Sequence, residues 1–381
     1  MTAVPPSTED IAAALAVVTD PEIRKPITEL DMVKSVDVGP DGSVDVALYL
    51  TVAGCPHRET LSADVSRAVA KVPGVADVRV TLDVMSDEQR KALQQKVRGS
   101  SDERSIPFAE PGSRTRVYAV ASGKGGVGKS SVTVNLAVAL AQKGLSVGVV
   151  DADIYGFSVP RMLGISARPT QVEDMIMPPQ AYGVRVISIG MFVAGNNPVV
   201  WRGPMLHRAL QQFLADVFWG DLDVLLIDLP PGTGDIAISV AQLIPSAEIL
   251  LVTTPQLAAR EVAERAGAIA LQTKQQVVGV IENMAGLPCP HCGEMVEVFG
   301  SGGGAAVATS LSQLTGSRVR VLGSVPIDVR LREGGDEGVP LVLSDPTAQA
   351  AQALSAVADE LSVRSSSLLG ASLGISPMRA R

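Results

Sequence analysis

Aromatic residues and cysteines are scarce in this chain of 381 residues. Aromatics make up 3% of the sequence, and there are 3 cysteines. With so few rings, the interior must consist mainly of small aliphatic side chains packed as helices on sheets. An odd number of cysteines does not make a disulfide framework, so in a reducing compartment these residues are better interpreted as metal ligands or reactive thiols.

Long apolar runs and a secretory leader are also missing. No stretch of about 18 uncharged apolar residues occurs, which predicts that no segment spans a membrane. The N-terminus has no basic region leading into an apolar run, so we expect a cytoplasmic location. The formal net charge of −8 argues against general attraction to nucleic acid or to anionic lipid, and we expect neither as a partner.

The length predicts two or three domains and a large core. We expect a small α+β domain over residues 1–86, a linker over residues 87–114 that begins as a short helix, and a larger domain over residues 115–361. The linker is polar and charged, and it closes with Ser, Pro and Gly. Residues 362–381 are Ser-rich and lack acidic residues, so this tail is expected to be disordered.

Within the small domain, hydrophobic periodicity predicts two helices and two strands. Apolar side chains fall along one face of residues 7–18 and residues 56–71, which is typical of helices. Polar and apolar residues alternate over residues 44–52 and residues 76–84, which is typical of strands.

The larger domain alternates apolar runs with helical patterns. This order predicts βαβ units and an α/β fold with a mainly parallel, doubly wound sheet. Such sheets bind ligands beyond the carboxyl ends of their strands. The predicted strands are residues 116–121, 146–150, 184–189, 223–229, 248–253, 277–281 and 318–322.

A glycine-rich run, GKGGVGKS, occupies residues 123–130. It lies between a β-prone run and a run of helix formers, which is the order that a phosphate-binding loop needs. Its glycines let the backbone turn tightly and direct N–H groups at phosphate oxygens, helped by the positive end of the following helix. The predicted nucleotide-binding residues of this run are Gly123, Lys124, Gly125, Gly126, Val127, Gly128, Lys129, Ser130 and Ser131.

Two side chains of this loop and three aspartates have predicted roles in phosphate chemistry. Lys129 would reach the β- and γ-phosphates, and the Ser130 hydroxyl would bind Mg²⁺. Asp228 ends an apolar run in the manner of a Walker B carboxylate and would hold Mg²⁺ directly or through water. Asp153 is placed to orient or deprotonate the attacking water, with Asp151 beside it in the magnesium shell. The alternative interpretation of these aspartates is that their side chains only stabilise turns, by hydrogen bonds to the nearby backbone.

The sequence CPHCG places Cys289 and Cys292 with two residues between them, so that both can bind one metal or cluster. Three interpretations compete: a redox disulfide, a zinc site completed by His291 and another ligand, and a site shared between two chains. A redox motif is expected to open a helix near a thioredoxin-like pattern, which is absent. A twofold dimer would bring two pairs together and complete four thiolates, which suit zinc and an iron–sulfur cluster alike.

The order of motifs resembles a known family. GKGGVGKS, DADIYGFSVP, VVWRGPM, LLIDLPPGTGD, IENMAG and CPHCG occur in the order found in the Mrp/ApbC family of iron–sulfur cluster carriers, within the MinD, ParA and nitrogenase iron protein superclass. The resemblance implies a homodimer that hydrolyses ATP slowly and delivers clusters to apo-proteins. It implies a labile [4Fe–4S] cluster bridged by Cys289 and Cys292 of both chains. It also implies that Lys124 reaches across the dimer to the partner's nucleotide.

The resemblance assigns further residues. In this family the asparagine matching Asn283 binds the adenine base, and Pro326 and Asp328 match the segment that closes over the base. The N-terminal region resembles the small domain of iron–sulfur assembly proteins, where the cysteine matching Cys55 is reactive. Cys55 directly precedes a predicted helix, whose dipole would favour its thiolate. The alternative for Cys55 is a buried small hydrophobic residue.

The rival function is that of a MinD- or ParA-like spatial organiser, in which ATP-driven dimerisation controls binding to a membrane or DNA. Such a protein needs a basic amphipathic surface element. The three arginines of the tail, at positions 364, 379 and 381, are the only hint of one. The CPHCG motif would have no role in that function.

Overall fold

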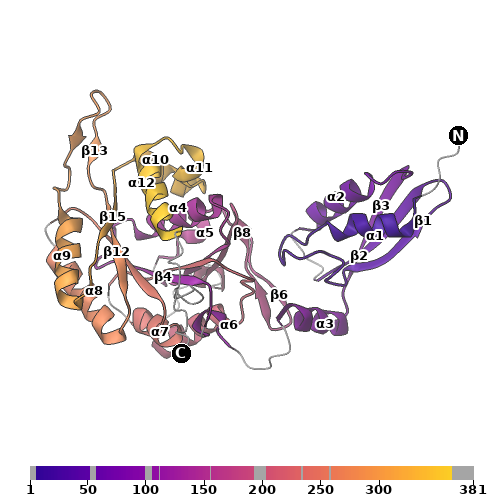
Figure 1. Cartoon of the computed structure of the whole chain (residues 1–381), viewed down its shortest axis with the longest axis horizontal. Coiled ribbons are helices and arrows are strands. Elements are labelled where there is room, and N and C mark those ends of the chain that lie inside the picture. The colour runs from indigo at the N-terminus through magenta and orange to yellow at the C-terminus, as the bar shows by residue number, and fades with distance from the viewer. Residues whose placement is uncertain are drawn as a thin grey trace, which may run out of the picture.

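The protein is described here by a computed structural model. The chain forms two units, a small one in its first quarter and a large one after it (Figure 1). The residues that the structure describes are 6–51, 57–98, 105–110, 112–154, 156–192, 203–232, 235–256 and 259–362.

The small unit is a three-stranded sheet covered by helices. Its strands lie in the order β1-β2-β3, with β1 antiparallel and β3 parallel to β2. β2 alternates between partly and fully buried residues, as its sequence predicts. The helices and strands of this unit are α1 (Thr8–Ala16), β1 (Val33–Val38), β2 (Ser43–Leu50), α2 (Arg58–Val69), β3 (Asp77–Val84) and α3 (Asp87–Arg98).

The predicted linker begins with α3, a helix of 12 residues. Leu93 of α3 is 2% exposed and belongs to the hydrophobic core of the small unit. Because this helix buries a side chain in that core, it adds to the small unit and is more than a spacer. The domain boundaries inferred from the sequence stay predictions.

The large unit contains an eight-stranded sheet in which all neighbours are parallel except the edge strand β8. The predicted α/β fold with a mainly parallel, doubly wound sheet is confirmed. In order across the sheet, the strands are β15 (Val321–Val325), β12 (Val277–Asn283), β11 (Glu248–Thr253), β4 (Arg116–Ala121), β10 (Val224–Asp228), β5 (Val147–Asp151), β9 (Val184–Ser188) and β8 (Gln180–Ala181).

Helices cover both faces of this sheet (Figure 1), and each face has its own hydrophobic core. One face packs α4 (Lys129–Gln142), α5 (Val159–Met162), α10 (Val329–Glu337), α11 (Leu341–Ser344) and α12 (Gln349–Ser362). The other packs α6 (Gly203–Ala215), α7 (Asp235–Leu243), α8 (Ala259–Thr273) and α9 (Gly303–Thr315). Short 3₁₀ helices are η1 (Pro107–Ala109) and η2 (Ile189–Phe192).

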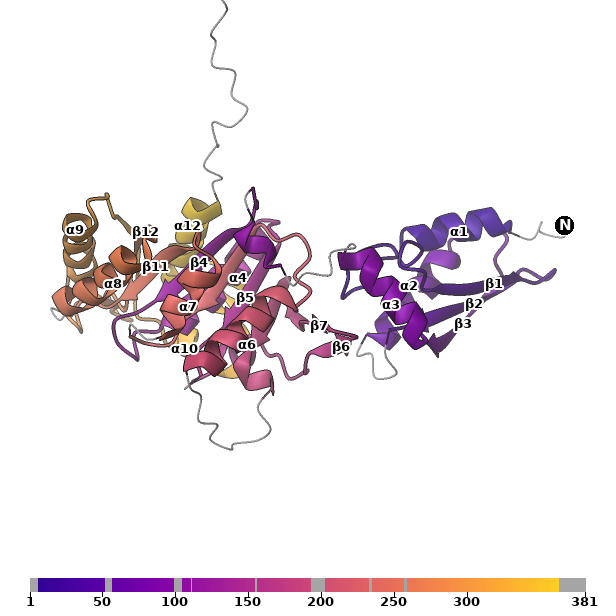
Figure 2. The same ribbon diagram turned by 90° about the horizontal axis from the view of Figure 1, so that it is seen from below.

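A hairpin of the large unit, β6 (Thr170–Val172) and β7 (Met175–Met177), packs into the core of the small unit. In Figure 2 it extends from the large unit towards α3. Val172 and Met175 are fully buried within the cluster of apolar side chains that forms the small unit's core. Polar contacts surround this packing, including a 3.2 Å ion pair between Arg90 and Glu173. The two units are therefore joined by an apolar contact as well as by the chain.

A second hairpin, β13 (Leu287–Pro288) and β14 (Met295–Val296), follows β12 and projects beyond the large unit, as Figure 1 shows. Its strands pair in antiparallel fashion, Leu287 with Val296 and Pro288 with Met295. Its tip carries the CPHCG motif.

Candidate nucleotide site and cysteine hairpin

The glycine-rich loop connects the buried strand β4 to the N-terminus of α4, as the sequence predicts. Gly128 is the N-cap of α4 and has a φ of +78°, a left-handed conformation that glycine adopts without strain. A Cβ on Gly128 would lie 2.3 Å from Nδ2 of Asn283. Both backbone conformation and lack of space therefore require glycine at this position.

Lys129, Ser130 and Asp228 meet at the carboxyl end of the sheet. Nζ of Lys129 lies 2.7 Å from Oδ1 of Asp228, and the Ser130 hydroxyl donates a 2.6 Å hydrogen bond to Oδ2. The Thr133 hydroxyl donates to Oδ1 at 2.8 Å. The Asp228 side chain is fully buried and that of Lys129 is 6% exposed, so water screens their attraction little.

This donor set fits magnesium. Mg²⁺ prefers hard oxygen ligands and is usually held by one or two carboxylates together with substrate phosphates. Ser130 and Asp228 offer a hydroxyl and a carboxylate within hydrogen-bonding distance of each other, next to a loop whose backbone suits phosphate. These two residues would hold the ion.

Asp151 holds a loop at the end of β5. Its carboxylate accepts hydrogen bonds from the Ser188 hydroxyl at 3.0 Å and from the backbone N–H groups of Asp153 at 3.2 Å and Val159 at 3.3 Å. Burial raises the pKa of Asp151 to about 7, and the neighbouring charge of Asp228 adds to the shift. These contacts position the segment that carries Asp153, which is 9% exposed. The predicted place of Asp151 in the magnesium shell stays a prediction.

Lys124 lies in the same loop but points to a different partner. Its Nζ donates to Oε1 of Gln256, beyond the end of β11. Within its own chain Lys124 thus has Gln256 as a partner, whereas Lys129 pairs with Asp228. The predicted action of Lys124 across a dimer stays a prediction.

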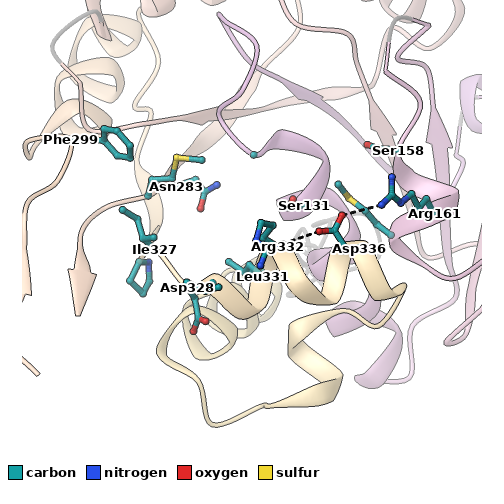
Figure 3. A pocket seen from close by; sticks show the side chains of 16 residues that line it. Ser131, Ser158, Arg161, Asn283, Phe299, Ile327, Asp328, Leu331, Arg332 and Asp336 are labelled. Carbon is teal, nitrogen blue, oxygen red and sulfur yellow. Dashed lines mark hydrogen bonds and ion pairs between the residues drawn. The ribbon is translucent and has the colours of Figure 1, made fainter. Parts of the chain in front are cut away.

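A cavity of about 450 Å³ adjoins the glycine-rich loop (Figure 3). Asn283, Pro326 and Asp328, the residues expected to surround a base, all line it, and so does Ser131. Asn283 donates from Nδ2 to the backbone oxygen of Val127 at 2.9 Å, which leaves its Oδ1 and a second N–H for a ligand. The cavity therefore joins the phosphate loop to a site whose size suits a nucleoside.

Sequence reasoning did not identify several residues that line this cavity. Arg332 and Arg161 both pair with Asp336, at 3.1 and 3.2 Å, along one wall. Met284 and Phe299 line it from the segment that carries the cysteine hairpin. The IENMAG motif was a signal for Met284, whereas no sequence pattern marked Phe299 or the charged residues.

The cysteine pair lies at the exposed tip of the β13–β14 hairpin. Backbone bonds of 2.9 Å close the turn, from the Cys289 N–H to the oxygen of Glu294 and from the Gly293 N–H to the oxygen of Cys289. Cys292 is exposed and Cys289 is half-buried. The backbone N–H groups of Cys292 and His291 lower the pKa of Cys289, which favours its thiolate. Two thiols that a partner molecule can reach are thus presented together.

The large unit matches the family described as NUBPL iron-transfer P-loop NTPase over residues 113–362. The chain belongs to this iron-transfer P-loop NTPase family. Residues 8–82 match a second family, described as iron–sulfur cluster assembly protein. Both matches confirm the relationship that the motifs indicated.

Relatives of this P-loop NTPase share most of its length. It is 65% identical to the iron–sulfur cluster carrier protein of Mycobacterium tuberculosis over 369 residues, 97% of each chain. It is 40% identical to the protein of that name from Bacillus subtilis, covering 84% of this chain and 88% of the relative. A nucleotide-binding protein from Archaeoglobus fulgidus, solved in complex with ADP, aligns with a TM-score of 0.50 and 37% identity, covering 59% of this chain and 87% of that one.

Some predicted features of this iron-transfer NTPase fall outside the described residues. These are Cys55, positions 199–202 of the VVWRGPM motif, positions 233–234 of the LLIDLPPGTGD motif, and residues 363–381 of the tail with its three arginines. Over the described part of the chain, no helix is long and apolar enough to cross a membrane. That same part contains no group of three or more His, Cys, Asp or Glu side chains placed to hold a metal ion.

Proposed function

We propose that the protein is a homodimeric ATPase that carries a [4Fe–4S] cluster and transfers it to apo-proteins. The observation that supports this most is the cysteine hairpin, which presents two thiols at an exposed tip in the same domain as a phosphate-binding loop. Membership in an iron-transfer P-loop NTPase family agrees with it, as does the name, iron–sulfur cluster carrier protein, of a relative that aligns over 97% of each chain.

For the ATPase, each side chain has a role that its position supports. Lys129 binds the phosphates, and Ser130 and Asp228 hold Mg²⁺, which neutralises phosphate charge when bound. Asp153 orients the attacking water or accepts its proton, and Asp151 positions Asp153 through its backbone hydrogen bond. In phosphoryl transfer, positioning and electrostatic stabilisation supply most of the catalysis, so no covalent intermediate is required.

For the cluster, the number of thiols requires a second chain. One hairpin offers Cys289 and Cys292, whereas a [4Fe–4S] cluster is held by four thiolates. A twofold dimer supplies the other pair. A cluster held by two residues from each side at an exposed tip is accessible, which suits a carrier that gives up its cargo. Lys124 would act on the partner's nucleotide in such a dimer. Bound ATP would thereby favour the dimer over separate chains.

The rival function is a MinD- or ParA-like organiser that binds a membrane or DNA. It would use the same nucleotide site but leave Cys289 and Cys292 without a role. Transfer of a cluster to an apo-protein is expected of a carrier and not of an organiser, so measuring it distinguishes the two functions.

The test mixes the reconstituted protein anaerobically with the apo form of a [4Fe–4S] enzyme and follows recovery of that enzyme's activity. We expect transfer from the wild type and none from a preparation of Cys292→Ser treated identically. The control is free iron and sulfide at equal concentration with a strong chelator present. Recovery no faster than this control would contradict the proposal, as would ATP-dependent binding to lipid vesicles or DNA without transfer.

A further inference from the structure

The segment that carries the cysteines is anchored in the sheet at both ends. At its start, Asn283 ends β12, and the N–H of Ala285 donates to the oxygen of Val325 at 2.9 Å. At its end, the N–H of Gly304 in the first turn of α9 donates to the Glu282 carboxylate at 2.7 Å. Residues 284–302 between these anchors form the hairpin and its return.

Two side chains of this segment border the nucleotide cavity, one from each end. Among residues 284–302, all of them described, Met284 and Phe299 line the cavity. The Met284 methyl group lies 3.8 Å from the position that a Cβ on Gly128 would occupy, so it is next to the phosphate loop. Figure 3 shows the Phe299 ring on the same side of the cavity as Asn283. A base in the cavity would therefore meet both ends of the cysteine hairpin.

Phe299 is 38% exposed, and the apolar residue Val298 beside it is 49% exposed. An aromatic ring at the mouth of a nucleoside-sized cavity is suited to contact a base, because base–aromatic contact does not depend on a particular hydrogen-bond pattern. Bringing a base against the ring would cover apolar surface that is now exposed to water. The nucleotide would therefore bind more tightly when the hairpin lies in a position that brings Phe299 against the base.

A movement of Phe299 would be transmitted to the cysteines through the two short strands of the hairpin. Phe299 lies three positions after the end of β14, and β14 pairs with β13, Met295 opposite Pro288. Cys289 comes directly after Pro288 and is held to Glu294 by a backbone hydrogen bond. The hairpin also packs closely on itself, since a Cβ on Gly286 would lie 2.8 Å from Met295. Displacement of β14 therefore moves the turn that carries both thiols.

We propose that Met284 and Phe299 bind the nucleotide's base and thereby couple nucleotide occupancy to the position and exposure of Cys289 and Cys292. This inference rests on the proposed function for the identity of the nucleotide, and it adds how nucleotide binding reaches the cluster site. The hairpin would be in equilibrium between positions in which the protein has different affinities for the nucleotide, and this difference produces the coupling. By linkage, a ligand on the cysteines changes nucleotide affinity by the same factor.

The experiment measures alkylation of the thiols in the full-length, reduced, metal-free protein. Iodoacetamide is added at one fixed pH with and without saturating Mg–ADP, and each cysteine-containing peptide is quantified by mass spectrometry. ADP is used because it cannot be hydrolysed at this site. For the wild type we expect ADP to change the alkylation rates of Cys289 and Cys292 about fivefold, the low end of common coupling strengths.

Three variants of exposed residues make the test specific, and none removes core packing. Phe299→Ala should bind ADP about tenfold more weakly, as expected for a lost base–aromatic contact, and at saturation should show nearly equal alkylation rates with and without ADP. Phe299→Tyr keeps the ring and should behave as the wild type. Val298→Ala is the matched control, because Val298 is exposed on the same segment but does not line the cavity.

The inference is overturned if saturated Phe299→Ala keeps the wild-type ratio of alkylation rates, or if saturated wild type shows no change. Failure of the proposed function is seen separately. A wild type that binds ADP and changes its alkylation rates, but transfers no cluster, would refute cluster carriage and support the coupling. A wild type that binds no ADP in equilibrium dialysis would refute both.

Discussion

The Ser130 hydroxyl donates a 2.6 Å hydrogen bond to Oδ2 of Asp228, so the first turn of α4 and the end of β10 direct their oxygen atoms to one point. Lys129 reaches the other oxygen of the same carboxylate. This arrangement concentrates positive charge and magnesium ligands where phosphate would bind. It makes Asp228 and Lys129 central to the proposed hydrolysis.

The first prediction separates nucleotide binding from hydrolysis. Lys129→Ala should abolish ATP turnover, because it removes the charge that binds the phosphates. Asp153→Ala should still bind nucleotide but hydrolyse it roughly 100-fold more slowly, since general-base assistance commonly contributes at least that much. Release of radioactive phosphate measures the rates, and Asp221→Ala is the control because Asp221 is exposed and precedes β10, at the end of the strand opposite Asp228. Turnover of Asp153→Ala at the wild-type rate would show that its assigned role is wrong.

The second prediction concerns Lys124. If it acts on the partner's nucleotide, a mixed dimer of Lys124→Ala and Asp153→Ala chains contains one intact composite site. Equal mixing should then restore about a quarter of wild-type hydrolysis, since half of the dimers are mixed and each has one such site. Each variant alone should be nearly inactive while still binding nucleotide. Absence of recovery in verified mixed dimers would count against action across the interface.

The third prediction is a pH dependence in the small unit. Burial raises the pKa of Glu22 to about 7, and the charge of Asp20 adds to this shift. The folded state therefore binds a proton more tightly than the unfolded chain, so the free energy of unfolding should fall as pH rises from about 4.5 to about 7. One pKa unit corresponds to about 1.4 kcal/mol, which limits this loss to about 3 kcal/mol.

Glu22→Gln tests this effect, because the amide cannot ionise and still accepts from Thr170, whose hydroxyl lies 3.5 Å from Glu22. The variant should be more stable than the wild type at pH 8 and similar at pH 4.5, as measured by urea unfolding followed by circular dichroism. Glu29→Gln is the control, since Glu29 is an exposed glutamate of the same unit. Equal stability of Glu22→Gln and the wild type at both pH values would refute the prediction.

The fourth prediction tests the contact between the two units. Met175 is fully buried among the core side chains of the small unit, so Met175→Ala should lower stability by roughly 2–5 kcal/mol. The small unit should also become more sensitive to limited proteolysis. Leu314→Ala truncates a half-exposed side chain of α9 in the large unit, so it should leave the proteolysis of the small unit unchanged. An unchanged proteolysis pattern in Met175→Ala would show that this contact does not hold the units together.

Sequence patterns predicted the sheet of the large unit well, because its strands are continuous apolar runs. β4 and β11 have the predicted bounds, and Asp151 and Asp228 lie at the carboxyl ends of their strands. The order of the strands and the ends of β15, which begins three residues later than predicted, depend on pairing between distant segments. Periodicity within one segment contains no information on such pairing.

Other features had no local signal. β6 and β7 are three residues each, too short to show a period, and their burial depends on the small unit. The role inferred for Phe299 could not be predicted, because the residues that follow it have the composition of a glycine-rich turn. The path of the hairpin in the folded chain is what brings its ring to the cavity. The phosphate loop could be predicted because its chemistry depends on residues adjacent in sequence.

The central claim is that Cys289 and Cys292 of two chains hold one cluster. The most direct measurement is anaerobic reconstitution followed by iron and sulfide analysis and Mössbauer spectroscopy. The account predicts about four iron atoms and four sulfides per dimer, the content of one [4Fe–4S] cluster. It predicts loss of both in Cys289→Ser and near-normal content in His291→Ala and Cys55→Ser. Tightly bound zinc without a brown chromophore, or full cluster loading in Cys289→Ser, would contradict it.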